Sequence, residues 1–133
     1  MNLESLTKQL IQIESISPND AGCFDILESA LEGMNFSCER ISYKNVENLY
    51  AVIGTQGPTL CFLGHTDVVP TGPTDQWTYP PFSGETHDDH IYGRGAADMK
   101  SSVAAFVEAA KDFINASEKL RQAKKLVKSQ ETD

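Results

Sequence analysis

TLCFLGHTD, residues 59–67, places a short apolar run directly before a histidine and an aspartate. Such a run predicts a strand at residues 59–63 that is buried on both faces, as in the parallel sheets of α/β proteins. Ligand sites of these sheets lie beyond the carboxyl ends of the strands, where this segment delivers His65. The stretch therefore predicts both a fold class and the place of a site.

Helical patterns and extended runs alternate on both sides of this segment. Apolar residues at helical spacing predict helices over about 3–13, from 23 to about 33, and from about 99 onward. Further strands are predicted at 36–41, 48–53 and 91–92. Residues 64–85, rich in Gly, Pro, Thr and Asp, predict a long loop. This order predicts an α/β sandwich with a mixed, partly parallel sheet flanked by helices.

Length and composition exclude several classes of protein. A chain of 133 residues with 40% hydrophobic and 23% charged residues is typical of one globular core. No apolar run approaches a membrane span, and Glu4 and Lys8 interrupt what would be a signal peptide. The net charge of −8 argues against a nucleic-acid partner. Three cysteines without CxxC spacing indicate a reduced, cytoplasmic protein.

The charge divides the chain into two segments. Residues 1–117 carry 16 acidic and 6 basic side chains, whereas residues 118–133 carry 3 acidic and 5 basic ones. We therefore predict a folded part over 1–117 and a divergent basic helical tail over 118–133. The tail is expected to continue the third helix in solvent, and the alternative is an amphipathic helix that binds a partner or a membrane.

Three residues could carry chemistry, and each also has an ordinary structural explanation. His65 and Asp67 project to the same side of an extended chain, so the carboxylate could orient the imidazole. On spacing alone, the pair is more typical of a strand-end histidine bonded to a nearby aspartate. Asp98 follows a glycine-rich turn and could either cap the third helix or face a cation. Arg94 in that turn could neutralise a neighbouring acid or be surface charge.

Two other groups of residues have mainly structural interpretations. The run His87-Asp88-Asp89-His90 resembles a metal cluster, but Asp-rich sequence between short extended pieces is more typical of an exposed turn. The aromatic residues around Trp77 are expected to pack a loop against the core.

GHTDVVPTGP (64–73), PPFSGE (80–85) and IYGRGAADMK (91–100), in this order, resemble the M20 family of co-catalytic zinc amidohydrolases, and within it the desuccinylases. The resemblance runs from the first helix to about residue 110. It implies that residues 1–117 are the amino-terminal part of an M20-type catalytic domain, an incomplete zinc-peptidase-like unit.

The resemblance also implies roles for single residues. His65 would bind one zinc ion, Asp98 would bridge two zinc ions, and Asp67 would be the catalytic-site aspartate that orients His65; cobalt could replace zinc. The implied reaction is hydrolysis of N-succinyl-LL-2,6-diaminopimelate, a small molecule, to succinate and LL-diaminopimelate in lysine biosynthesis, using water activated by two zinc ions. The alternatives are deacetylation of acetylornithine or another deacylation, or a truncated remnant without catalysis.

The chain departs from the family pattern in several places. It lacks the family's glutamate pair, later ligands and inserted dimerisation domain, so the family's homodimer is not expected from this chain alone. Glu131 follows no apolar strand and cannot be assigned the general-base role. Ser101 replaces a usual glycine, and Asp89-His90 replaces a usual Asp-Gly turn. We therefore expect the isolated chain to be inactive.

Overall fold

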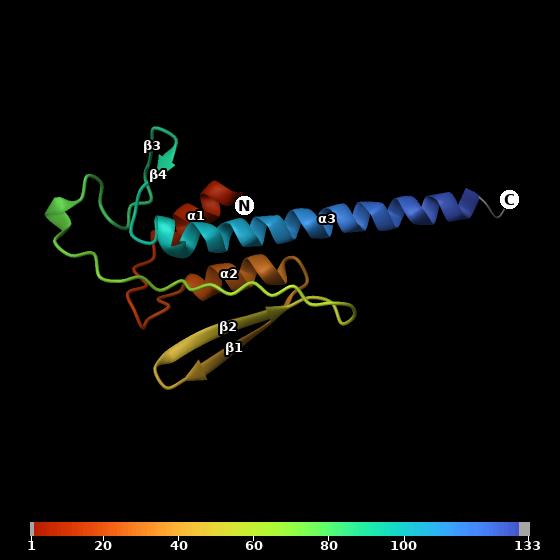
Figure 1. Ribbon diagram of the computed structural model, residues 1–133, viewed down its shortest axis with the longest axis horizontal. Coiled ribbons are helices and arrows are strands. Elements are labelled where there is room, and N and C mark those ends of the chain that lie inside the picture. Colours follow the sequence, from red (N-terminus) through yellow and green to blue (C-terminus); the bar gives the residue numbers. More distant parts are fainter. Residues whose placement is uncertain (1, 131–133) are drawn as a thin grey trace.

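The structure is a computed structural model that describes the backbone of residues 2–130 and the side chains of residues 2–125. Three helices, α1 (Leu3–Ile11), α2 (Cys23–Glu32) and α3 (Ser101–Gln130), lie against one another (Figure 1). Their apolar faces meet in one core, made of Leu6, Leu10, Cys23, Leu27, Leu31, Val103, Ala104 and Val107. The three predicted helices are confirmed, with ends that differ by about two residues.

Two of the predicted strands form a hairpin beside α2. β1 (Ser37–Tyr43) and β2 (Val46–Val52) pair antiparallel, in a register that runs from Ser37 opposite Val52 to Tyr43 opposite Val46. The side chains on one face, among them Cys38, Leu49 and Ala51, pack against the helical core. The strands predicted at 36–41 and 48–53 are thereby confirmed, with ends that differ by one or two residues.

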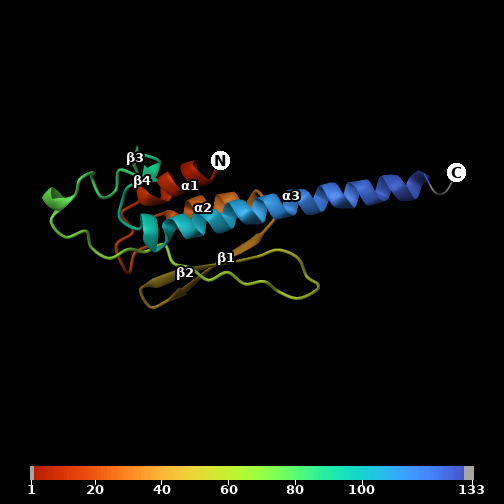
Figure 2. The same ribbon diagram turned by 45° about the horizontal axis from the view of Figure 1, so that its top comes forward.

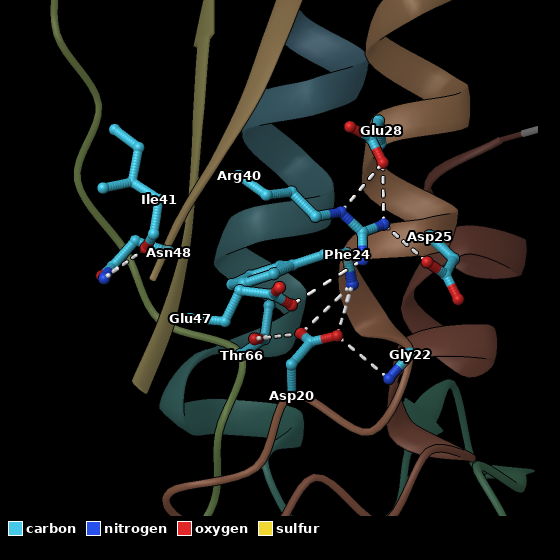
Figure 3. Close-up of polar contacts among 10 residues, drawn as sticks. All are labelled: Asp20, Gly22, Phe24, Asp25, Glu28, Arg40, Ile41, Glu47, Asn48 and Thr66. Carbon is cyan, nitrogen blue, oxygen red and sulfur yellow. Dashed lines mark hydrogen bonds and ion pairs between the residues drawn. The ribbon is translucent and has the colours of Figure 1, made fainter. Parts of the chain in front are cut away.

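One ion-pair cluster ties this hairpin to α2. Arg40 of β1 places Nη2 2.5 Å from Asp25 Oδ1 and 2.7 Å from Glu28 Oε2, and Nη1 lies 3.7 Å from Glu47 Oε2 (Figure 3). The hydrogen bonds to Asp25 and Glu28 raise the pKa of Arg40. The cluster is open to solvent, so it fixes the orientation of the hairpin more than it stabilises the fold.

The prediction of a buried strand at residues 59–63 is wrong for this chain. These residues form no strand, and Leu60 and Leu63 are 89% and 90% exposed. Only one face is partly covered, where the Phe62 ring stacks on Phe106 with centroids 4.3 Å apart. A strand needs a neighbour to pair its backbone, and the described residues supply none here.

The sheets are correspondingly small. The described residues form two antiparallel two-stranded sheets, β1–β2 and β3–β4, and the parallel pairing among them is the isolated bridge between Ile16 and Val68. The chain is therefore of mixed α and β structure, as predicted. The mixed, partly parallel sandwich stays a prediction about a more complete domain.

The long loop predicted at residues 64–85 is confirmed and holds one short helical turn, η1 (Thr74–Gln76). It leads into a hairpin of β3 (Thr86–His87) and β4 (His90–Ile91). β4 begins one residue before the strand predicted at 91–92. Asp88 and Asp89 connect the two strands with φ of 47° and 61°, a left-handed conformation that aspartate tolerates. The turn interpretation of residues 87–90 is confirmed.

α3 continues far beyond the core. Figures 1 and 2 show its second half projecting away from the rest of the molecule, and the described side chains of residues 118–125 are exposed. Glu131 lies outside the described residues. Among the helices the structure describes, none is long and apolar enough to cross a membrane.

Candidate metal centre

His65 and Asp98, 33 residues apart in the sequence, face each other. The Nε2 atom of His65 lies 3.2 Å from Oδ1 of Asp98. The other ring nitrogen, Nδ1, lies 3.0 Å from the backbone oxygen of Asp67 and 3.4 Å from its Oδ1. The structure thus brings together the three residues that were candidates from the sequence. Asp67 lies at the Nδ1 side of the imidazole and Asp98 at its Nε2 side.

Asp98 reaches this position because the chain leaves the helical conformation just before α3. It belongs to the turn η2 (Ala96–Lys100), where Asp98 has φ −130° and ψ 96°, and the Asp98–Met99 peptide is cis. Among the described residues, its carboxylate contacts His65 and no amide of α3. The cap interpretation of Asp98 is therefore wrong: α3 begins only at Ser101, and the side chain is 87% exposed beside His65.

The loop that carries His65 is anchored through its neighbour Thr66, which is buried. The Thr66 hydroxyl donates to Asp20 Oδ1 at 3.3 Å (Figure 3). Asp20 also accepts the amides of Gly22 and Phe24, each at 3.0 Å from its Oδ2, and so caps the first turn of α2. One carboxylate therefore joins the start of α2 to the candidate site.

Lys100 anchors the other side of the site. Its side chain is 0% exposed, and Nζ donates to the carbonyl oxygens of Leu10 at 2.7 Å and Ile13 at 2.8 Å. Leu10 lies in the last turn of α1 and Ile13 two residues beyond the helix, and the ammonium group is a second donor to each carbonyl, beside the amides of Ile13 at 3.3 Å and Ser15 at 2.9 Å. The bonds fix the turn η2, and hence Asp98, to α1. Burial lowers the pKa of Lys100.

Arg94 neither pairs with an acid nor extends into solvent as free surface charge. Its guanidinium lies over the Trp77 ring, 5.0 Å from the centroid, and Nη2 donates to the Pro70 carbonyl at 3.3 Å. The Trp77 indole in turn donates to the Thr71 carbonyl at 3.1 Å. Trp77 therefore packs within the loop, against Arg94, and packing of the loop's aromatic residues against the core stays a prediction.

The two histidines of the β3–β4 hairpin have other partners. His87 stacks on Tyr79 at 3.9 Å between centroids and bonds Glu85 at 2.9 Å, which lowers the pKa of Glu85. His90 Nδ1 lies 2.6 Å from the Asp88 carbonyl oxygen. They do not join the His65 site.

His65 and Asp98 are the types of residue that bind zinc, but two protein ligands are fewer than a catalytic zinc site usually has. An imidazole nitrogen and a carboxylate oxygen are both common zinc ligands, and the imidazole is backed by an aspartate, as in many zinc sites. Catalytic zinc sites usually have three protein ligands. No cluster of three or more His, Cys, Asp or Glu suited to a metal occurs within the part of the chain that the structure describes. The site is therefore part of a metal centre at most.

The sequence analysis missed Ser15, Ser17, Asp20 and Lys100, which hold this site together. Ser15 and Ser17 precede Pro18, in a segment that follows the first predicted helix and to which no role was assigned from the sequence. The grouping of Ser15, Ser17 and Asp20 around Pro18 was the available signal, because small polar side chains beside a turn often bond neighbouring backbone.

A match to a known protein family covers the residues of the candidate site. Residues 61–128 match the family described as peptidase family M20/M25/M40. The match includes most of the basic tail. The similarity to the family therefore does not end at residue 118, where the charge of the chain changes.

Individual relatives are close in sequence. A protein named succinyl-diaminopimelate desuccinylase in Psychromonas ingrahamii is 52% identical over 112 residues, covering 84% of this chain and 30% of the relative. Proteins of the same name in Methylobacillus flagellatus and Dechloromonas aromatica are 53% and 54% identical over 109 and 111 residues, covering 82% and 84% of this chain. Each of these two matches covers 29% of the relative.

The chain thus spans about 30% of the length of the curated relatives that it matches. The family match nevertheless covers more than half of its own residues, including His65, Asp67 and Asp98. The chain belongs to the peptidase family M20/M25/M40.

Proposed function

We propose that this chain is the amino-terminal part of the catalytic domain of a zinc-dependent desuccinylase. The complete enzyme would hydrolyse N-succinyl-LL-2,6-diaminopimelate to succinate and LL-diaminopimelate. The names of the relatives support the substrate, and the observation that carries the site is the approach of His65 Nε2 to Asp98 Oδ1 at 3.2 Å. We expect a cytoplasmic enzyme that acts, like its family, as a homodimer on a small molecule.

Each of the three residues has a defined task in this proposal. His65 would bind one zinc ion through Nε2, because Nδ1 already faces the backbone and carboxylate oxygens of Asp67. Asp98 would be the carboxylate ligand that both zinc ions share. Asp67 would keep the imidazole oriented and raise its basicity as a ligand. A pair of zinc ions would lower the pKa of a water molecule and polarise the scissile carbonyl. Cobalt could serve in place of zinc.

The remaining parts of the site have to come from residues that this chain does not contain. Two donors are fewer than a catalytic zinc site usually has, and a general base is required to move the proton of the attacking water. In the complete domain we also expect residues 59–63 to pair with neighbouring strands and form the mixed sheet. The isolated chain should therefore bind zinc weakly and not turn over substrate.

Zinc titration tests the site directly. Calorimetry of the 133-residue chain should show weak binding that His65→Ala or Asp98→Asn reduces at least tenfold. His90→Ala is the matched control, because its ring also bonds a local carbonyl but lies away from Asp98. Loss of binding in His90→Ala with full binding in His65→Ala would refute the proposed ligand set.

Complementation tests the reaction. Succinate release would be measured for the chain alone and together with the carboxy-terminal part of one of the relatives. We expect activity only in the mixture, and only toward the succinylated substrate. Preferential hydrolysis of acetylornithine would instead make the complete enzyme a deacetylase. Turnover by the isolated chain would show that the two-donor argument is wrong.

A further inference from the structure

A short segment before Pro18 lies along the loop that carries His65. Ile16 and Val68 form a parallel bridge, in which the Val68 amide donates to the Ser15 carbonyl at 2.8 Å and the Ser17 amide donates to the Val68 carbonyl at 3.0 Å. Two backbone bonds therefore fix the register between this segment and the loop. The side chains of both serines are placed by that register.

The two serine hydroxyls bond different parts of the same loop. Ser15 is buried and donates to the backbone carbonyl of Thr66 at 2.7 Å. Ser17 is exposed, and its hydroxyl donates to Oδ2 of the Asp67 side chain and also lies 3.4 Å from the Val68 carbonyl oxygen. Ser15 thus bonds only the backbone of the loop, whereas Ser17 also bonds a side chain of the candidate metal centre.

The Asp67 carboxylate divides its oxygens between two partners. Oδ2 accepts from Ser17, and Oδ1 lies 3.4 Å from Nδ1 of His65. An aspartate carboxylate rotates easily about its last torsion angle, and this one is 42% exposed, so water competes for both oxygens. A bond from a backbone-fixed hydroxyl to one oxygen holds the other toward the imidazole.

We propose that Ser17 is a positioning residue of the metal centre, which acts through Asp67 to hold the His65 ring with Nε2 toward Asp98. The part of this inference that concerns metal rests on the proposed function. The part that concerns the orientation of the ring is independent of the proposed function, because it depends only on the contacts from Ser17 to Asp67 and from Asp67 to His65.

The first experiment measures zinc affinity of the full chain for Ser17→Ala, Ser17→Thr and Ser15→Ala. Removing a residue that supports a metal ligand typically costs 10–100-fold in affinity, and we expect about tenfold for Ser17→Ala because the contact is partly solvated. Ser17→Thr keeps the hydroxyl and should bind as the wild type does. Ser15→Ala should lower the melting temperature but leave the affinity within about twofold of the wild type, since its bond is to backbone. Equal affinity of Ser17→Ala and wild type, with His65→Ala impaired, would overturn the proposal.

The second experiment needs no metal. The ratio of the two neutral tautomers of His65 would be measured by ¹⁵N NMR in alkaline buffer. Releasing Asp67 should shift the proton from Nδ1 toward Nε2 in Ser17→Ala, and not in Ser17→Thr or Ser15→Ala. If zinc binding proves independent of His65, the proposed metal site fails, and this measurement alone decides the role of Ser17. An unchanged tautomer ratio in Ser17→Ala would then overturn it.

Discussion

Lys100 is a charged side chain that the fold buries completely beside the candidate metal centre. Its two hydrogen bonds go to the carbonyls of Leu10, in the last turn of α1, and of Ile13, just beyond it, where a positive charge is favoured by the helix dipole. Lysine is otherwise rarely buried without an acidic partner. The carbonyls of Leu10 and Ile13 therefore explain how the fold tolerates it.

We predict that Lys100→Met lowers the free energy of unfolding by about 1–3 kcal/mol, because it removes two hydrogen bonds that a charged group donates to backbone carbonyls at and just beyond the end of α1. Urea denaturation followed by circular dichroism measures the change. Lys124→Met, at an exposed position of α3, is the control and should have almost no effect. A Lys100→Met chain as stable as the wild type would show that water replaces the ammonium group.

The pH dependence of stability gives a second test of Lys100. Burial lowers its pKa in the folded state, so the unfolded chain binds more protons between that pKa and the ordinary lysine value of about 10.4. The free energy of unfolding of the wild type should therefore rise relative to Lys100→Met as the pH increases through this alkaline window. A difference that falls with pH would mean that the folded state holds the proton more tightly than the unfolded chain does.

At the residue scale, the sequence predicted which side chains would meet but not what would hold them. His65 and Asp98 stand out because their motifs are specific in order and spacing. Ser17 and Lys100 act through contacts with residues 50 and 87–90 positions away, between elements whose packing no local pattern encodes.

Among the elements, the helices were predictable because each carries its own apolar periodicity, and the hairpin because its strands are adjacent in the sequence. Residues 59–63 show where that reasoning fails. An apolar run predicts burial, but the neighbours that bury it and pair its backbone have to be supplied by other segments. The described residues supply Phe106 on one face and no strand.

α3 combines a packed half and an exposed half in one helix. Val103, Ala104 and Val107 are buried in the core, whereas the described side chains of residues 118–125 are exposed. A helix without packing is marginal in water, so the second half draws its order mainly from the first.

We predict that deleting residues 118–133 leaves the folded part intact and changes solubility only modestly. The melting temperature of the shortened chain should stay close to that of the full chain, and its helical circular dichroism signal should decrease. Substituting buried Val107 with Asp in the full chain is the contrasting control and should unfold the core. Unfolding on removal of the tail would make the tail a structural element of the domain.

The molecule as a whole exposes apolar side chains that a folded domain of this size would normally cover. Several lie on residues 59–63 and on the β1–β2 hairpin, namely Tyr43, Tyr50, Leu60 and Leu63, with exposures of 69%, 55%, 89% and 90%. Exposed apolar residues beside unpaired backbone recruit other chains. The helices therefore cover the core on their side, whereas apolar side chains along residues 59–63 stay exposed to solvent.

We predict that the isolated chain self-associates through this open side, and that Leu60→Ser with Leu63→Ser shifts it toward the monomer. Burying a leucine side chain contributes roughly 1.5–3 kcal/mol, so losing two should weaken association by about a hundredfold or more. Size-exclusion chromatography with light scattering, over a range of concentrations, measures the shift. Leu120→Ser is the matched control, because Leu120 is 58% exposed but lies on the projecting half of α3. A complementary carboxy-terminal part should suppress self-association of the wild type by covering the same leucines. If Leu120→Ser gives the monomer and the double variant does not, the chains associate through α3 and not through residues 59–63.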